Sequence, residues 1–409
     1  MNRTPYKLAV LGSHPIQYQA PLFRVLAQKP AIDLHVFFCR RIGWERYQDP
    51  GFGVTFSWDI PLLEGYKHTF LRNISPYANS SRFFGVVNPG IVAAIWQGKF
   101  DAIWINGWAL ATNWIAWASA SALHVPILLR SETNGLAEPR GLRRGVKRMV
   151  LQTFFSRVAG FLAIGTNNEN YYKSYGVPQE RIFLTPYSVD NAFFMERARE
   201  LAGQKRDLRE KEGIPPDLPI ILFCGKFQEK KRPLDLLRAF SLLNGQPPAA
   251  LVFVGDGALR PAMERFVAQH SLPHVYFLGF KNQKEIATYY AMADVLVLPS
   301  SDETWGLVLN EAMCCGLPVV ASDKVGAAAD LVREGVNGFI YPVGNVSALA
   351  DRLQRVLADE QTRKEMGRQS REIISRWGIK EDIEGVLKAL QAVVPKRIPL
   401  CRTHLLSCF

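Results

Sequence analysis

The chain has 409 residues, of which 48% are hydrophobic and 21% charged, and its formal net charge at pH 7 is +12. This composition excludes a disordered chain, and the length predicts two domains. Most of the excess positive charge lies in residues 1–200. That asymmetry has two explanations, an anionic partner such as a membrane surface or a solvated basic face.

Cysteine usage and the N-terminus indicate the compartment. The six cysteines include no C-x-x-C pair, and several lie in apolar runs, so neither a zinc ribbon nor a disulfide scaffold is supported. The apolar run near the N-terminus is too short for the core of a signal peptide. We therefore expect a reducing, cytoplasmic location.

The first half of the chain alternates apolar strands with helical stretches. Its first turn, Gly12-Ser13-His14-Pro15, lacks the G-x-G-x-x-G fingerprint of dinucleotide enzymes. Residues 40–90 are rich in Gly, Pro and aromatic residues and predict an irregular insertion that could recognise an acceptor. Strands are predicted at residues 8–11, 34–38, 102–105, 125–129, 161–164 and 182–186, with helices ending near residue 28 and covering residues 109–122 and 141–155.

Residues 102–129 contain no Asp, Glu, Lys or Arg and are long enough to span a bilayer. Polar residues interrupt this stretch throughout, however, among them Asn106, Asn113 and His124. Such a sequence would make a poor spanning helix, so we predict a strand, a helix and a strand.

Residues 141–155 have the pattern of a basic amphipathic helix. Arg143, Arg144, Lys147 and Arg148 alternate with apolar residues at helical spacing. Two interpretations stay open, peripheral contact with an anionic membrane and a solvated basic face.

The second half predicts another alternating β/α unit, entered through a highly charged segment at residues 198–219. The loop 225–233 carries Lys226, Lys230, Lys231 and Arg232 directly after a strand. Strands are predicted at residues 220–224, 250–254, 274–278, 295–298, 319–321 and 338–341, and helices at residues 234–243, 347–357, 362–377 and 382–393. Residues 395–409 show no periodicity and predict a loosely ordered tail.

Residues 293–318 join a buried strand, a polar turn and a short helix that begins near Gly306. The N-terminus of such a helix presents unpaired N–H groups and binds anions, typically a diphosphate. Glu303 precedes the helix and Glu311 lies within it. Carboxylates that flank a diphosphate favour hydroxyl groups, which predicts a nucleotide-sugar; two solvated surface acids are the alternative.

The spacing E-x7-E followed by A-M-x-x-G-x-P-V-V, from Glu303 to Val320, resembles the retaining GT-B glycosyltransferases of family four. The resemblance implies an α/β fold of the GT-B type, with two Rossmann-like domains facing a cleft. It also implies an acceptor domain at residues 1–190 and a donor domain at residues 191–376. A helical segment at residues 377–394, possible partner of the first domain, and the tail at residues 395–409 would follow.

The same resemblance implies how the donor is held. Gly225-Lys226 matches the family's G-R pair and Lys231 its downstream lysine, both toward the diphosphate; lysine here replaces a bidentate arginine. Glu311 would bind the ribose and Glu303 the sugar. The other donor-pocket residues implied are Gly255, Gly257, Gly279, Phe280, Thr304, Trp305, Gly306 and Leu307, where Trp305 replaces the usual Phe and the backbone of residues 305–307 would bind the β-phosphate.

The first half departs further from the family. Asn106 stands where the family has a histidine after its fourth strand, and the first loop lacks the usual glycine pair. The catalytic candidates are therefore Lys226, Lys231 and Glu303, named above, together with His14 and Glu132. His14 can instead be structural, and Glu132 can instead pair with Arg130.

The resemblance implies a hexosyltransferase that moves a sugar to a saccharide or lipid-linked acceptor. The chain has no D-x-D pair, so neither a metal nor a cofactor beyond the nucleotide-sugar co-substrate is expected. Nucleic acid is not an expected partner, and peripheral contact with an anionic membrane stays open. A nucleotide-sugar epimerase and a non-catalytic binding module remain alternatives.

Overall fold

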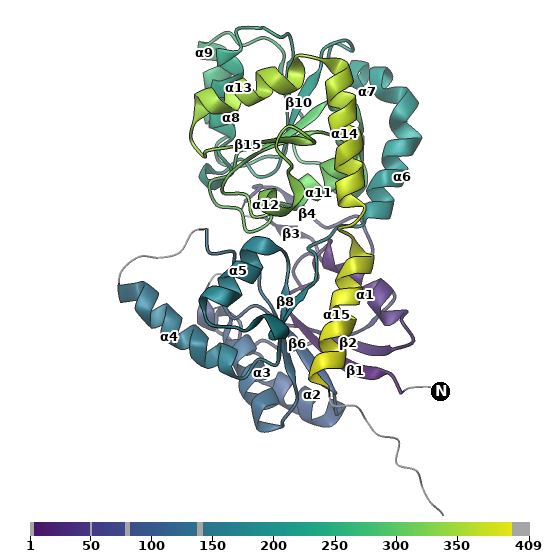
Figure 1. Cartoon of the computed structure of the whole chain (residues 1–409), viewed down its shortest axis with the longest axis vertical. Coiled ribbons are helices and arrows are strands. Elements are labelled where there is room, and N and C mark those ends of the chain that lie inside the picture. The colour runs from purple at the N-terminus through teal and green to yellow at the C-terminus, as the bar shows by residue number, and fades with distance from the viewer. Residues whose placement is uncertain (1–3, 50, 78–81, 137–141, 395–409) are drawn as a thin grey trace, which may run out of the picture.

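The computed structural model describes residues 4–49, 51–77, 82–136 and 142–394, with the side chains of residues 142–144 left aside. Two parallel sheets, each covered by helices on both faces, lie one above the other (Figure 1). This confirms the predicted pair of Rossmann-like units. The predicted tail at residues 395–409 lies outside the described residues.

The N-terminal sheet has the strand order β5-β2-β1-β6-β7-β8-β9, and all its pairs are parallel. Successive residues of β1 point to opposite faces, so Leu8 joins one core cluster and Ala9 the other. Burial on both faces explains why these strands are continuous apolar runs. The strands are β1 (Tyr6–Gly12), β2 (Ile32–Phe38), β5 (Lys67–Phe70), β6 (Ala102–Asn106), β7 (Ile127–Arg130), β8 (Gly160–Ala163) and β9 (Ile182–Leu184).

The helices of this half are α1 (Gln19–Ala27), α2 (Gly90–Gly98), α3 (Ala111–Ala122), α4 (Leu142–Ser156) and α5 (Thr166–Ser174). The charge-free stretch of residues 102–129 folds as β6, α3 and β7, as predicted. Within the described part of the chain, no helix combines the length and the apolarity that crossing a bilayer requires.

The C-terminal sheet has the order β12-β11-β10-β13-β14-β15. Its strands are β10 (Ile220–Cys224), β11 (Ala250–Val254), β12 (Val275–Phe277), β13 (Val295–Leu298), β14 (Val319–Ser322) and β15 (Gly338–Tyr341). Its helices are α6 (Asn191–Leu201), α7 (Lys205–Lys211), α8 (Pro233–Leu242), α9 (Arg260–Gln269), α10 (Gln283–Met292), α11 (Leu307–Cys314), α12 (Ala328–Leu331), α13 (Val346–Leu357) and α14 (Glu360–Ile374).

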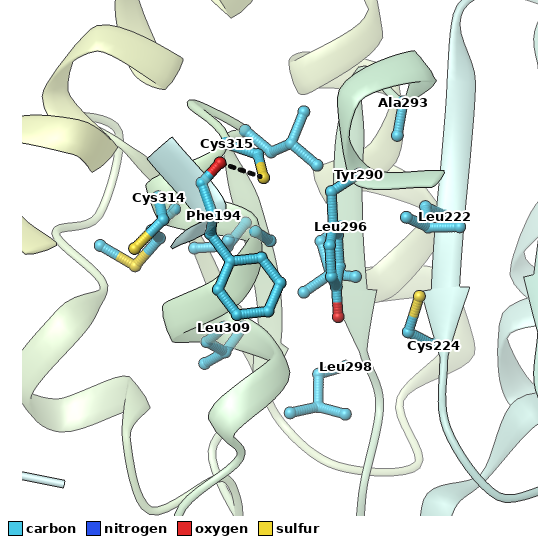
Figure 2. Packing of buried hydrophobic residues seen from close by; sticks show 14 of the residues in the cluster. Phe194, Leu222, Cys224, Tyr290, Ala293, Leu296, Leu298, Leu309, Cys314 and Cys315 are labelled. Carbon is cyan, nitrogen blue, oxygen red and sulfur yellow. Dashed lines mark hydrogen bonds between the residues drawn. The ribbon is translucent and has the colours of Figure 1, made fainter. Parts of the chain in front are cut away.

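One core of this half lies directly behind the carboxyl ends of β10 and β13. The ring of Tyr290 stands beside both strands, and its phenol oxygen points toward the level of their last residues, Cys224 and Leu298 (Figure 2). Phe194 packs against Tyr290 edge to face, with ring centres 6.1 Å apart. This packing aims a buried hydroxyl group at the strand ends, where α/β sheets bind ligands.

The last helix, α15 (Ile379–Val393), leaves the C-terminal half and packs against α1, β8 and β9, as the yellow helix in the lower half of Figure 1 shows. Its Asp382 is buried and forms an ion pair of 2.9 Å with Arg130. The chain therefore crosses between the halves twice.

The predicted irregular insertion at residues 40–90 contains regular structure. The strands β3 (Tyr47–Gln48) and β4 (Thr55–Phe56) pair as an antiparallel hairpin, and β5 forms an edge of the N-terminal sheet. These elements are too short and too exposed to produce a hydrophobic period. The hairpin lies between the two halves (Figure 1).

Candidate functional site

A cavity of about 630 Å³ opens between the two halves, at the carboxyl ends of both sheets. Most of the predicted site residues line it, and they come from both halves. They are His14, Glu132, Gly225, Lys226, Lys231, Glu303, Thr304, Trp305, Gly306, Leu307 and Glu311.

A smaller cavity of about 130 Å³ adjoins the first and shares Gly225 and Glu311 with it. Gly255 and Phe280 line this second cavity. Gly257 and Gly279 line neither of the two, so their place in the nucleotide pocket stays a prediction. Gly279 accepts a backbone hydrogen bond of 2.9 Å from Gly255, and a side chain at residue 257 would meet the backbone of Phe227.

The N-terminus of α11 faces the large cavity. Gly306 precedes the helix with φ of 103°, a conformation that favours glycine, and a side chain there would meet Leu298. The first N–H groups of α11 are therefore presented to the cavity. The ring of Trp305, by contrast, is buried, stacks on Trp377 with ring centres 5.7 Å apart and donates to Asn310 at 2.9 Å.

Glu303 and Lys231 form an ion pair at the cavity wall, and Ser300 donates a hydrogen bond of 3.3 Å to the same carboxylate oxygen. The backbone of this turn is held from the other half. Asn134 donates to the carbonyl oxygens of Glu303 and Thr304 at 3.1 and 3.0 Å. The turn is thus positioned by both halves of the molecule.

Glu311 projects from α11 into the junction of the two cavities. Tyr290 donates a hydrogen bond of 2.6 Å to its carboxylate, which favours the ionised form. Burial acts in the opposite direction and is the larger effect, raising the pKa of Glu311 to about 7. Nearby Cys224 is also buried, and burial holds the pKa of its thiol above the ordinary value, so it is protonated at neutral pH.

Lys226 is bound by a carboxylate of the other half. Its Nζ lies 2.8 and 3.0 Å from the two oxygens of Asp49, on the hairpin. The same ammonium group lies 4.9 Å from the centre of the Phe52 ring. Asp49 also accepts hydrogen bonds from the N–H groups of Gly51 and Phe52 at 2.8 and 3.0 Å, and these interactions with donors hold its pKa below the ordinary value although burial opposes them.

Glu132 is held by two phenols on the wall formed by the N-terminal half. Tyr187 and Tyr18 both donate to its Oε1, the latter at 3.4 Å. Burial is the main reason that the pKa of each phenol lies above its ordinary value. The predicted alternative that Arg130 pairs with Glu132 is wrong, because Arg130 binds Asp382 on α15.

His14 lies in the first loop, where its Nδ1 is 2.9 Å from the hydroxyl oxygen of Ser13. Burial, aided by the charge of Arg40, lowers the pKa of His14 to about 4, so its ring is neutral at pH 7. Asn106, at the position of the family's histidine, accepts a hydrogen bond of 2.9 Å from Trp104.

Sequence reasoning missed Asp49, Phe52, Tyr18 and Tyr187, all of which line the large cavity. Asp49 and Phe52 lie in the insertion, which has no periodicity from which a contact could be inferred. Tyr187 follows the short strand β9, and its place after a strand end was the available signal.

Comparison with known proteins identifies the family. Residues 204–373 match the model for glycosyl transferases group 1, and residues 25–188 match that for a glycosyl transferase 4-like domain. The D-inositol 3-phosphate glycosyltransferase of Paenarthrobacter aurescens is 30% identical over 290 residues, 66% of this chain and 68% of the relative. The chain belongs to the group 1 glycosyltransferases of family four.

Two further relatives are also glycosyl-transferring enzymes, one at lower identity and one matched over a shorter stretch. The D-inositol 3-phosphate glycosyltransferase of Xylanimonas cellulosilytica is 28% identical over 319 residues, 74% of each chain. The N-acetyl-alpha-D-glucosaminyl L-malate synthase of Bacillus anthracis is 33% identical over 174 residues, 42% of this chain and 45% of that enzyme. The chain is thus a glycosyltransferase that uses a nucleotide-sugar.

Solved structures confirm the GT-B fold. A glycosyltransferase from Rickettsia africae has a TM-score of 0.76 at 15% identity, covering 96% of this chain and all of that one. Anabaena HepE in complex with UDP and glucose has a TM-score of 0.71 at 17% identity, covering 95% and 100%.

Proposed function

We propose that this enzyme transfers a sugar, with retention of configuration, from a UDP-sugar to a hydroxyl group of a saccharide or lipid-linked acceptor. One observation carries the proposal. The α11 N-terminus, Lys226, Lys231, Glu303 and Glu311 converge on a single cavity between the halves. The choice of UDP is supported by the HepE structures, which hold UDP and UDP-glucose.

The donor would lie along the N-terminus of α11. Its diphosphate would accept from the first N–H groups of the helix and meet Lys226 beside Gly225. Glu311, at the junction of the cavities, would accept hydrogen bonds from the ribose hydroxyl groups. Glu303 would bind the transferred sugar, on the side where Lys231 also lies.

Charge development explains how this site would accelerate transfer. As the bond between the sugar and the phosphate breaks, positive charge grows on the sugar ring and negative charge on the leaving diphosphate. Lys226, Lys231 and the helix N-terminus stabilise the leaving group. Both lysines pair with carboxylates, Lys226 with Asp49 and Lys231 with Glu303, so the diphosphate would compete with these acids.

The acceptor would approach from the N-terminal half, where His14 and Glu132 line the same cavity. His14 is neutral near pH 7 and can accept a hydrogen bond, and Glu132 is fixed by Tyr18 and Tyr187. In a retaining reaction the acceptor attacks on the face that the leaving group vacates, and a phosphate oxygen then assists in removing its proton.

We further propose a cytoplasmic enzyme that works at the inner face of the membrane in the synthesis of cell-surface polysaccharide or glycolipid. The α4 helix supports this placement. Val146, Met149 and Val150 are 53%, 64% and 40% exposed, on a helix that also carries Lys147 and Arg148.

The proposal is tested by binding and turnover together. A UDP-sugar at 100 times its Kd should raise the free energy of unfolding by about 2.7 kcal/mol. Transfer that requires an added acceptor supports the proposal, whereas products without acceptor would indicate the epimerase. Binding with neither transfer nor hydrolysis would indicate the non-catalytic module, which Asn106 keeps under consideration.

Two variants assign the parts of the donor. Glu311→Ala should weaken both UDP and UDP-sugar by about 1.5 to 3 kcal/mol, because a charge-assisted hydrogen bond is lost. Glu303→Ala should lower turnover without weakening UDP binding, because the pair that competes with the diphosphate for Lys231 is lost. Unchanged UDP affinity in folded Glu311→Ala would overturn the ribose assignment.

A further inference from the structure

We infer that the β3–β4 hairpin of the N-terminal half, described at residues 47–49 and 51–58, forms one wall of the nucleobase pocket and that Phe52 is the residue against which the base packs. The inference rests on the proposed function, since it extends the donor site beyond the ribose. It concerns residues that lie outside the motifs carrying the family resemblance.

The position of the base follows from the shape of the donor. In a nucleoside diphosphate the ribose connects the base to the diphosphate. We propose that this ribose binds Glu311, where the two cavities meet. The diphosphate takes the direction of Lys226 and α11, in the large cavity. The base must then project from the ribose away from the diphosphate, into the smaller cavity of about 130 Å³.

That smaller cavity is built by both halves. Phe280, Asn282 and Ile286 line it from the C-terminal half, while Phe52 and Trp58 line it from the hairpin. The Phe52 ring meets that of Phe280 edge to face, with ring centres 4.9 Å apart. An aromatic wall suits a nucleobase, because every base offers a π face for stacking.

The hairpin is seated firmly enough to act as a wall. Asn282 donates a hydrogen bond of 2.8 Å to the carbonyl oxygen of Ser57, and Lys284 N donates to Asp59 at 3.2 Å. The hairpin also approaches the loop after β10 closely at Gly51. A side chain at Gly51 would meet the side chain of Lys226, so the tip lies directly on the loop that binds the diphosphate.

This geometry has a consequence for catalysis. Glu311 and the hairpin belong to different halves, so a bound base contacts both and favours their closed arrangement. A base that fits the wall poorly would bind the C-terminal half yet close the cleft less well. Base selection would therefore arise partly from the N-terminal half, in which His14 and Glu132 are proposed to face the acceptor.

The test compares two ligands by calorimetry, UDP and inorganic pyrophosphate, the latter by displacement of UDP. Phe52→Ala should weaken UDP about tenfold, since stacking on the base is lost, and leave pyrophosphate unchanged. Phe52→Leu keeps apolar bulk without the ring, so its affinity for UDP should lie between those of the wild type and Phe52→Ala. Trp44→Ala is the matched control, because Trp44 is an exposed aromatic residue of the same insertion that lines neither cavity.

Wild-type affinity for UDP in Phe52→Ala would overturn the inference. So would an equal loss of UDP and pyrophosphate affinity, since that would indicate disturbance of Lys226. Failure of the proposed function looks different, because the wild-type protein itself would then bind no nucleoside diphosphate or would bind it without acceptor-dependent transfer.

Discussion

At the scale of single residues, Glu311 combines a structural cost with a proposed binding role. Burial raises its pKa from 4.5 to about 7. Because the folded-state pKa lies above the unfolded one, the group's contribution to the free energy of unfolding is fully present below pH 4.5 and is lost as the pH rises to about 7. A buried carboxylate that is costly to ionise is expected to be stabilised strongly by hydroxyl donors of a ligand.

The affinity for a UDP-sugar should therefore rise with pH. If the ionised form of Glu311 binds the ribose, its population and the affinity increase about tenfold between pH 6 and pH 8. The diphosphate of a UDP-sugar keeps its charge over this range, and His14, with a pKa of about 4, stays neutral. Calorimetry at a series of pH values measures the effect, and Glu311→Gln should bind more weakly with a flat profile. An unchanged slope in Glu311→Gln would assign the titration to another group.

Asp49 is expected to compete with the donor for Lys226. The pair is partly exposed, with 33% of the Lys226 side chain and 11% of the Asp49 side chain accessible. Asp49→Asn removes the competing charge and keeps an acceptor for the N–H groups of Gly51 and Phe52. UDP should then bind more tightly by about 1 kcal/mol, roughly fivefold. Titration at two salt concentrations measures this.

The control for Asp49→Asn is Glu45→Gln, which disrupts an exposed ion pair with Arg41 in the same insertion. Equal or weaker UDP binding by folded Asp49→Asn would show that the carboxylate orients Lys226 and does not compete with the donor.

At the scale of elements, α4 exposes apolar side chains beside its basic ones. Lys147 lies 5.7 Å from the ring centre of Trp108 and Arg148 lies 5.6 Å from that of Tyr175. The described basic side chains therefore contact aromatic rings of their own half, while Val146, Met149 and Val150 are exposed. Arg143 and Arg144 lie outside the residues whose side chains the structure describes.

Removing exposed apolar side chains from α4 should weaken membrane association. Met149→Ser with Val150→Ser should lower the fraction that sediments with anionic vesicles severalfold, because less apolar surface enters the interface. Stability should change little at such exposed sites. Val336→Ser, at an exposed site of the other half, is the control. Sedimentation equal to the wild type at both low and high salt would contradict a docking role for α4.

The elements also show what the sequence could predict. The strands at residues 220–224, 250–254, 295–298 and 338–341 have the predicted bounds, since buried parallel strands are apolar runs ended by Gly or Pro. The pattern of apolar residues does not predict α9 and α10. Their burial depends on neighbours far along the chain. The contact of Asp49 with Lys226 joins residues 177 positions apart. Such pairs arise from the arrangement of the halves, which local patterns do not encode.

At the scale of the whole molecule, the cleft is bridged on two sides. The hairpin binds the loop after β12 on one side, through Asn282 and Ser57. On the other side, the N-terminus of α5 contacts Asp330 of α12, and Asn167 donates a hydrogen bond of 3.0 Å to the carbonyl oxygen of Gly326. Because these contacts span the cleft, we expect the halves to separate when a donor enters and closure to complete the site.

Asp330 is the residue through which closure can be altered without touching the cleft. Its carboxylate accepts from the Thr166 hydroxyl group at 2.6 Å and from the Thr166 N–H at 3.0 Å, across the two halves. A buried donor that loses its partner costs about 1 to 3 kcal/mol. Asp330→Ala should therefore shift the donor-free protein toward open forms about tenfold.

Small-angle scattering measures this shift. Asp330→Ala should have a larger radius of gyration than the wild type without ligand, and saturating UDP-sugar should reduce the difference, because donor contacts with both halves oppose opening. Turnover at low donor concentration should fall while saturated turnover changes less. Glu360→Ala, which removes an exposed ion pair with Lys364 on α14, controls for a general loss of charge. A donor-free Asp330→Ala protein as small as the wild type would contradict a role for Asp330 in closure and would mean that the remaining contacts, among them those of Asn134, Asn167 and Asn282, hold the halves together.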